Sequence, residues 1–160
     1  MIEQTDFSKA YPLIHLPAKV TLIVTEKPVG GYNIMTAEWY MRTSIQPPMF
    51  AISIGHSRFT KDCLETVRFF NLVFPGKELH ALCNLAGSNS GREMDKFTEG
   101  KIEYLPGKLH KLPVLKQSIV TFECEVVTQV KSGDHTIYVG QVHYSWMNQE
   151  KELYYYEAKK

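Results

Sequence analysis

The stretch that decides the fold runs Gly30-Gly31-Tyr32-Asn33-Ile34-Met35-Thr36-Ala37-Glu38-Trp39, and Pro47-Pro48 follows eight residues later. Residues 20–25, just before it, are apolar and β-branched, so one strand enters a turn rich in proline and glycine and a second strand leaves it. Glycine has no Cβ, and threonine and alanine are compact, so main-chain N–H groups here remain accessible to the carbonyl oxygens of a planar ring. The stretch therefore predicts a nucleotide-cofactor site on β structure.

Composition limits the possible classes of protein. The chain has 160 residues, 44% of them hydrophobic, which predicts a single domain over residues 1–160. Eighteen basic residues against seventeen acidic ones leave a net charge of +1, so we expect neither a nucleic acid nor a membrane as partner. Cys63, Cys83 and Cys124 show no CxxC spacing, which argues against a disulfide framework or a zinc site and favours the cytoplasm.

Strand patterns outnumber helix patterns along the chain. A helix is expected from Thr60, with Thr60 itself as the N-cap, and residues 93–97 predict a short helix. Residues 100–116 are rich in Gly, Pro and Lys and predict an extended segment without regular structure. The expected strands cover residues 20–25, 32–36, 39–44, 49–54, 70–74, 119–130 and 136–146, with a helical segment at 76–85. This order predicts a mainly β protein, a small β-barrel with peripheral helices.

The segment 56–61 reads His56-Ser57-Arg58-Phe59-Thr60-Lys61 and lies between a strand end and a helix start. A helix start offers unpaired N–H groups, Ser57 and Thr60 offer hydroxyls, and Arg58 or Lys61 can neutralise a dianion, so the segment predicts a phosphate site. The alternative is that Thr60 merely caps the helix and the cations are solvated.

Other polar segments carry weaker signals. Residues 90–96 form a second polar loop that could close over a ligand, with Ser90, Arg92 and Lys96 on it. The alternative is a surface pair of Arg92 and Lys96, whose like charges at i, i+4 mildly favour a shared anionic partner. His135 lies in a tight turn and is more typical of an exposed turn residue than of a catalytic base. We find no HxH, HExxH, GxSxG, Walker or GxGxxG pattern, so the sequence predicts no metal site and supports neither acyl transfer nor a Rossmann fold.

An ordered set of residues runs through nearly the whole chain: Asn33-x-Met35-Thr36-Ala37-x-Trp39, Pro47-Pro48, Ser53-Ile54, Thr60, Asn71-Leu72, Ser90-Gly91-x-x-x-Asp95-Lys96-Phe97, Glu123-Cys124 and Gly133-Asp134-His135 with Gly140. In this set the chain resembles the flavin reductase-like FMN-binding split-barrel family, especially its flavoredoxin-type branch. The resemblance spans residues 17–142. It implies a six-stranded Greek-key split barrel and a homodimer with one FMN per subunit near the dimer interface.

The resemblance also implies roles for individual residues. Asn33, Met35, Thr36 and Ala37 would line the isoalloxazine edge, and Ser53 would lie beneath the ribityl chain. The phosphate would be surrounded by His56, Ser57, Arg58, Thr60 and Lys61. Ser90 and Lys96 would approach from the second polar loop, residues 90–96, which is called the covering loop below. The Gly-x-Thr-x-Ser-Ser pattern of many reductases in this family is absent here, so their substrate preference does not transfer.

The function implied is that of an FMN-dependent reductase that takes hydride from NADH or NADPH and passes electrons to a flavin, a ferric chelate or another small-molecule or protein acceptor. Flavin N5 carries this chemistry, so no catalytic side chain is expected. Two alternatives remain open: an electron-transfer flavoprotein without nicotinamide turnover of its own, and a binding domain of the same shape that has lost its flavin.

Overall fold

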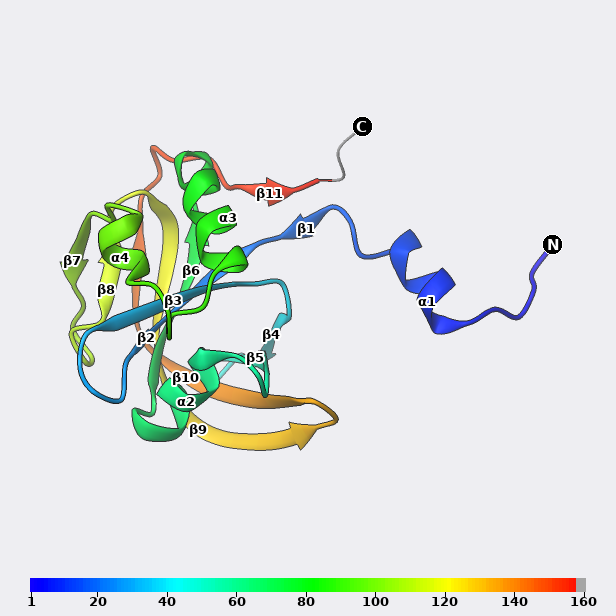
Figure 1. Ribbon diagram of the computed structural model, residues 1–160, viewed down its shortest axis with the longest axis horizontal. Helices are drawn as coiled ribbons and strands as arrows, with labels where there is room; N and C mark the ends of the chain where they lie inside the picture. Colours follow the sequence, from blue (N-terminus) through cyan, green and yellow to red (C-terminus); the bar gives the residue numbers. More distant parts are fainter. Residues whose placement is uncertain (158–160) are drawn as a thin grey trace.

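The computed structural model describes residues 1–157, and a seven-stranded antiparallel sheet forms its centre (Figure 1). The order of the strands across this sheet is β3-β2-β6-β9-β10-β5-β4. The strands are β2 (Thr21–Glu26), β3 (Tyr32–Ala37), β4 (Tyr40–Ser44), β5 (Met49–Gly55), β6 (Phe69–Pro75), β9 (Ser118–Ser132) and β10 (His135–Met147). The prediction of a mainly β protein is confirmed.

The two edge strands of the sheet, β3 and β4, are separated along the chain only by Glu38 and Trp39. The sheet must therefore curl until its edges meet at this corner, which makes it a barrel. Within residues 1–157 no ladder pairs β3 with β4, so the barrel is split there. Counting β3 and β4 as one strand bent at Glu38 and Trp39 gives the six strands that the family resemblance implies.

Strand β2 is buried on both faces, which explains its continuous apolar sequence. Ile23 packs inside the barrel with a cluster that includes Phe70 and Tyr138. Leu22 and Val24 face the opposite side, where they join the apolar residues of α3 (His80–Ser88). The prediction of a barrel covered by peripheral helices is confirmed by this second layer (Figure 1).

Helix α2 (Phe59–Thr66) lies where a helix was expected, but its predicted cap is wrong. Arg58 occupies the N-cap position and makes no side-chain capping bond, while Thr60 lies within the first turn. Thr60 is 2% exposed, and its hydroxyl accepts a hydrogen bond from the Asn33 amide. A tertiary contact with β3 has thus replaced the local capping contact.

Two further local predictions are wrong. The short helix expected at residues 93–97 is α4 (Lys96–Glu99), because Asp95 caps it three residues later than predicted. The segment expected to be irregular contains β7 (Tyr104–Pro106) paired with β8 (Pro113–Leu115).

The N-terminal segment, with α1 (Phe7–Ala10) and a 3-10 turn over Tyr11–Leu13, projects away from the barrel (Figure 1). It is joined to the body through β1 (Ala18–Lys19), which pairs with β11 (Tyr155–Tyr156). Among residues 1–157, no helix has the length and apolar character needed to span a bilayer.

Candidate functional site

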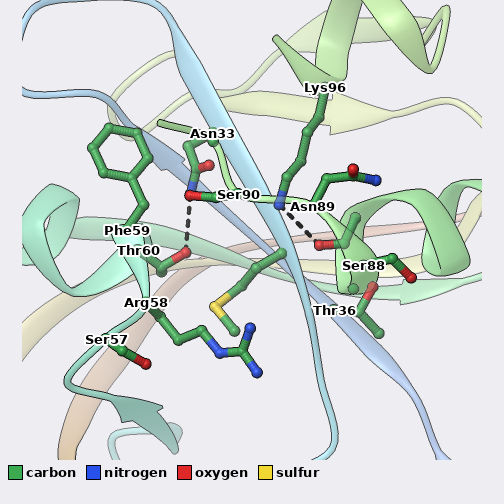
Figure 2. Close-up of a pocket in the computed structure, with 14 residues that line it drawn as sticks. Asn33, Thr36, Ser57, Arg58, Phe59, Thr60, Ser88, Asn89, Ser90 and Lys96 are labelled. Carbon is green, nitrogen blue, oxygen red and sulfur yellow. Dashed lines mark hydrogen bonds between the residues drawn. The ribbon is translucent and has the colours of Figure 1, made fainter. Parts of the chain in front are cut away.

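A cavity of about 180 Å³ opens between β3, the start of α2 and the segment that links α3 to α4 (Figure 2). Eight of the twelve predicted flavin contacts line it: Asn33, Met35, Thr36, Ser57, Arg58, Thr60, Ser90 and Lys96. The remaining lining residues are Phe59, Ala86, Gly87, Ser88, Asn89 and Gly91. The last turn of α3 and the residues after it, 86–91, therefore contribute a whole wall, of which only Ser90 was predicted.

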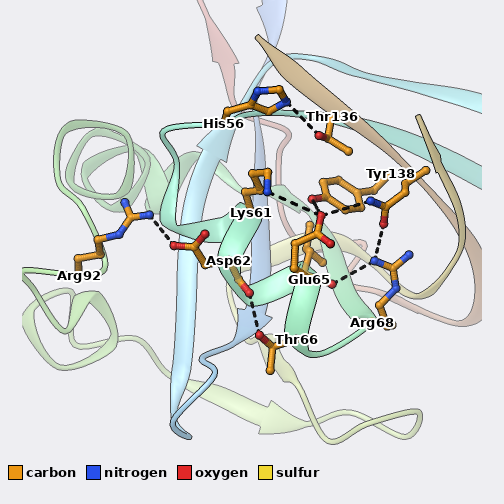
Figure 3. A network of polar contacts seen from close by, with 11 residues as sticks. His56, Lys61, Asp62, Glu65, Thr66, Arg68, Arg92, Thr136 and Tyr138 are labelled. Carbon is orange, nitrogen blue, oxygen red and sulfur yellow. Dashed lines mark hydrogen bonds and ion pairs between the residues drawn. The ribbon is translucent and has the colours of Figure 1, made fainter. Parts of the chain in front are cut away.

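The other four predicted contacts lie outside this cavity. Ala37 is buried, and its carbonyl accepts a hydrogen bond from Thr21. His56 is hydrogen-bonded to Thr136 over 3.1 Å, and the Lys61 ammonium lies 3.9 Å from a carboxylate oxygen of Glu65 (Figure 3). The assignment of Ala37, Ser53, His56 and Lys61 as flavin contacts stays a prediction.

Arg58 is the cation at the α2 end of the cavity, where its side chain points inward (Figure 2). Arg92, in the second polar loop, is already engaged. It donates to Asp62 over 2.6 Å (Figure 3) and to the Ser57 carbonyl over 3.1 Å. Arg58 forms no ion pair within the described part of the chain. Its guanidinium is therefore available to an anionic ligand.

Asn33 joins β3 to α2 at the back of the cavity. Its side-chain N–H groups donate to Thr25 Oγ1 over 3.3 Å and to Thr60 Oγ1 over 2.9 Å. Its Oδ1 atom is buried and has no partner among the described residues. Gly91 lies directly against this oxygen and leaves no room for a ligand atom there while the loop stays in place.

Gly91 allows the covering loop to lie directly over Asn33. A Cβ atom on Gly91 would come within 2.1 Å of Asn33 Oδ1 and within 2.8 Å of a Phe59 ring carbon. Both distances are shorter than van der Waals contact allows, so only glycine fits while the loop stays in place. The sequence showed this glycine in a polar loop but gave no sign of what it would touch.

Lys96 is a cation buried in the wall of the cavity, with only 4% of the residue exposed. Its ammonium group donates to the Ile34 carbonyl over 2.9 Å and to the Ala86 carbonyl over 2.8 Å. No carboxylate pairs with it within residues 1–157. Desolvation, with a smaller contribution from the like charge of Arg58, lowers the pKa of Lys96 to about 8.

Lys96→Met should change how stability depends on pH. The unfolded chain keeps the lysine proton up to its ordinary pKa of 10.5, whereas the folded protein releases it near pH 8. Between these values the unfolded state binds more protons, so this lysine makes the wild type more stable as pH rises. We expect the melting temperature of the wild type, minus that of Lys96→Met, to increase from pH 7.5 to 10.5. A constant difference would contradict the burial of a charged ammonium.

The position of Lys96 depends on the cap of α4. Asp95 accepts hydrogen bonds from the backbone N–H groups of Phe97 and Thr98 and from the Thr98 hydroxyl. Asp95→Ala should lower the free energy of unfolding by about 1 kcal/mol, as expected for the loss of an N-cap, and the melting temperature by about 2–4 °C. Asp95→Asn, which retains a capping oxygen, should recover most of the loss in thermal melts. Equal losses in both variants would show that the cap does not hold α4.

An apolar groove lies on the outer face of β4, β5 and β10. It is lined by Trp39, Tyr40, Met41, Ala51, Ile52, Ser53 and Ile137. His135 stacks on Trp39 with ring centroids 4.7 Å apart, and its Nδ1 lies 2.6 Å from Asp134 Oδ1. The hydrogen bond to His135 lowers the pKa of the Asp134 carboxyl.

His135 thus differs from the predicted exposed turn residue, because 23% of its side chain is exposed. The strand pairing that brings Trp39 beside His135 links residues almost a hundred positions apart. Local sequence carried no signal for this contact.

Comparison with known proteins places this geometry in context. Residues 13–160 match the family described as flavin reductase like domain. An uncharacterized protein of Archaeoglobus fulgidus is 34% identical over 128 residues, which cover 79% of this chain and 70% of that protein. A flavin reductase (NADH) of Kitasatospora aureofaciens is 30% identical, covering 79% of this chain and 64% of that protein. In three other relatives the match spans 63%, 51% and 47% of their lengths, so this chain covers less than two thirds of each of them.

The fold has a solved counterpart in a crystal structure of an FMN-binding protein from Thermus thermophilus with bound p-hydroxybenzaldehyde. The two chains superpose with a TM-score of 0.83 at 25% sequence identity, over 99% of this chain and 91% of that chain.

Proposed function

Because the chain belongs to the flavin reductase-like family, we propose that it binds FMN and uses NADH or NADPH to reduce a flavin, a ferric chelate or another acceptor. The observation that carries this proposal is the cavity beside β3, which is lined by two cations, Arg58 and Lys96. A relative is a flavin reductase (NADH), and a structural neighbour is an FMN-binding protein.

The residues of the cavity fit FMN at two places. Arg58, Ser57 and the first turn of α2 offer a guanidinium, a hydroxyl and N–H groups to a phosphate. At the other side, the buried ammonium of Lys96 donates to two carbonyls and has one N–H left to donate to the ligand. When bound, the flavin supplies hydride acceptance at N5, which requires no nucleophilic side chain.

The apolar groove beside Trp39 fits a second planar molecule. Its lining is mostly apolar, and the imidazole ring of His135 stacks on Trp39, one of the lining residues. We assign this groove to the nicotinamide or to an aromatic acceptor. The Thermus thermophilus neighbour binds p-hydroxybenzaldehyde, which supports a small aromatic compound as an acceptor.

A homodimer remains part of the proposal. Trp39, Met41 and Ile45 are exposed beside the groove, and a second copy would bury them and enclose the bound flavin. The three cysteines are free and buried, which agrees with a reducing cytoplasm.

Anaerobic assays of nicotinamide oxidation test the proposed activity. With FMN present and oxygen absent, a reductase oxidises NADH or NADPH catalytically when an acceptor such as a ferric chelate is added. Turnover with one nucleotide identifies the donor. A protein that binds flavin but shows no turnover with either nucleotide would instead be an electron carrier that depends on a partner protein.

A further inference from the structure

The N-terminal residues 1–17 form an arm that extends beyond the barrel (Figure 1). Its α1 and 3-10 turn contain no buried residue, and within residues 1–157 the hydrogen bonds of residues 6–15 join only residues of the arm itself. Phe7 stacks on Tyr11 with ring centroids 5.3 Å apart, and Tyr11 stacks on His15 over 5.5 Å. The arm is therefore held in shape by its own contacts, without support from the barrel.

The arm exposes large apolar side chains. Phe7, Leu13 and Ile14 are 77–83% exposed, and a group of exposed apolar residues marks an interaction surface. A segment that binds an anionic membrane carries an excess of lysine and arginine on its polar face. The first ten residues of this chain contain two acids and one lysine, so the arm suits a protein surface better than a membrane.

A second apolar surface without a partner lies at the edge strand β4. Trp39 and Met41 line the apolar groove, Ile45 follows the strand, and all three are exposed. We call these three residues the groove rim. In Figure 1, β4 lies on the side of the barrel from which the arm projects. Two copies related by a two-fold axis can therefore cover both surfaces at once, because the arm of each copy meets the groove rim of the other.

The arm is long enough for this exchange. Its α1, its 3-10 turn and the extended residues 14–17 together span about 25 Å. A compact chain of 160 residues has a radius of gyration of about 15 Å. The arm can thus cross from the side of one barrel onto the surface of a neighbouring copy.

We propose that two copies of the chain exchange their N-terminal arms, so that the apolar residues of each arm pack against the groove rim of the other copy. This inference rests on the homodimer of the proposed function and names the segment that joins its subunits. The arm of the other copy forms the outer wall of the apolar groove, so each groove is complete only in the dimer.

Cross-linking of a full-length double variant tests the exchange. Leu13→Cys combined with Met41→Cys places one thiol on the arm and one on the groove rim, whereas the three native cysteines are buried. A short bismaleimide should join two chains, and mass spectrometry should find positions 13 and 41 linked between them. The matched control combines Leu13→Cys with Val29→Cys, on the exposed turn between β2 and β3 at the opposite side of the barrel (Figure 1). It should give at least tenfold less covalent dimer.

Equal yields from the two double variants, or a link between positions 13 and 41 within one chain, would overturn the inference. Sedimentation equilibrium provides a second test. Phe7→Ser, Leu13→Ser and Ile14→Ser combined should raise the dissociation constant of the dimer at least a hundredfold, and the barrel should still fold because it does not bury these side chains. An unchanged constant would overturn the arm exchange and leave the homodimer intact. A monomeric wild type would overturn both, while its flavin binding, measured by absorption, would still test the rest of the proposed function.

Discussion

Gly91→Ala should reduce the affinity for FMN by a hundredfold or more. The added methyl group would lie 2.1 Å from Asn33 Oδ1 and 2.8 Å from the Phe59 ring, so the covering loop must move away from β3. That movement displaces Ser90 and opens the wall formed by residues 86–91. The quenching of flavin fluorescence on titration with protein measures the loss.

Gly87→Ala is the matched control for this substitution. Gly87 also lines the cavity, but its added Cβ would lie 3.4 Å from Thr36 Cβ, which is ordinary van der Waals contact. Its affinity for FMN should stay within a few-fold of the wild type. If Gly91→Ala binds FMN as well as Gly87→Ala does, the covering loop is not part of the flavin site.

Arg58→Ala should weaken FMN by about 10- to 100-fold, the loss expected for a hydrogen bond to a charged group worth about 1.5–3 kcal/mol. Riboflavin lacks the phosphate and so has no charged group for Arg58 to bind. Its affinity should therefore change by less than about threefold. Calorimetric titrations with both ligands separate the two effects.

Arg92→Ala is the control for Arg58→Ala. Arg92 lies in the neighbouring loop, but its guanidinium is committed to Asp62 and to the Ser57 carbonyl and does not line the cavity. It should lower FMN affinity much less than Arg58→Ala. Equal losses of FMN and riboflavin in Arg58→Ala would contradict the assignment of the phosphate to this end of the cavity.

The sequence predicted the barrel because its strands are marked locally. The apolar residues of β2 and the glycines after it define the first hairpin, and Gly133 with Asp134 turns β9 into β10. A hydrophobic pattern and a turn motif each depend only on residues that are close together in the sequence, so these strands and turns could be predicted from it. The segment 100–116 was misread because β7 and β8 are short and interrupted by Pro, Gly and Lys.

The candidate site was predicted in part for the same reason. Ser57, Arg58 and Thr60 share one segment at the start of a helix, and they line the cavity together. The hydrogen bond between Asn33 and Thr60 and the approach of Gly91 to Asn33 depend on how separate elements pack. Such contacts between distant residues leave no pattern in a single sequence. The same holds for Lys96, whose burial follows from the docking of α4 beside β3.

The visible absorption spectrum of the protein, after incubation with FMN and removal of free flavin, tests the central claim most directly. The account predicts a flavin spectrum with one FMN per chain, which is bleached on anaerobic addition of NADH or NADPH. A protein that carries no flavin band after this treatment would contradict the assignment of the cavity beside β3 as a flavin site.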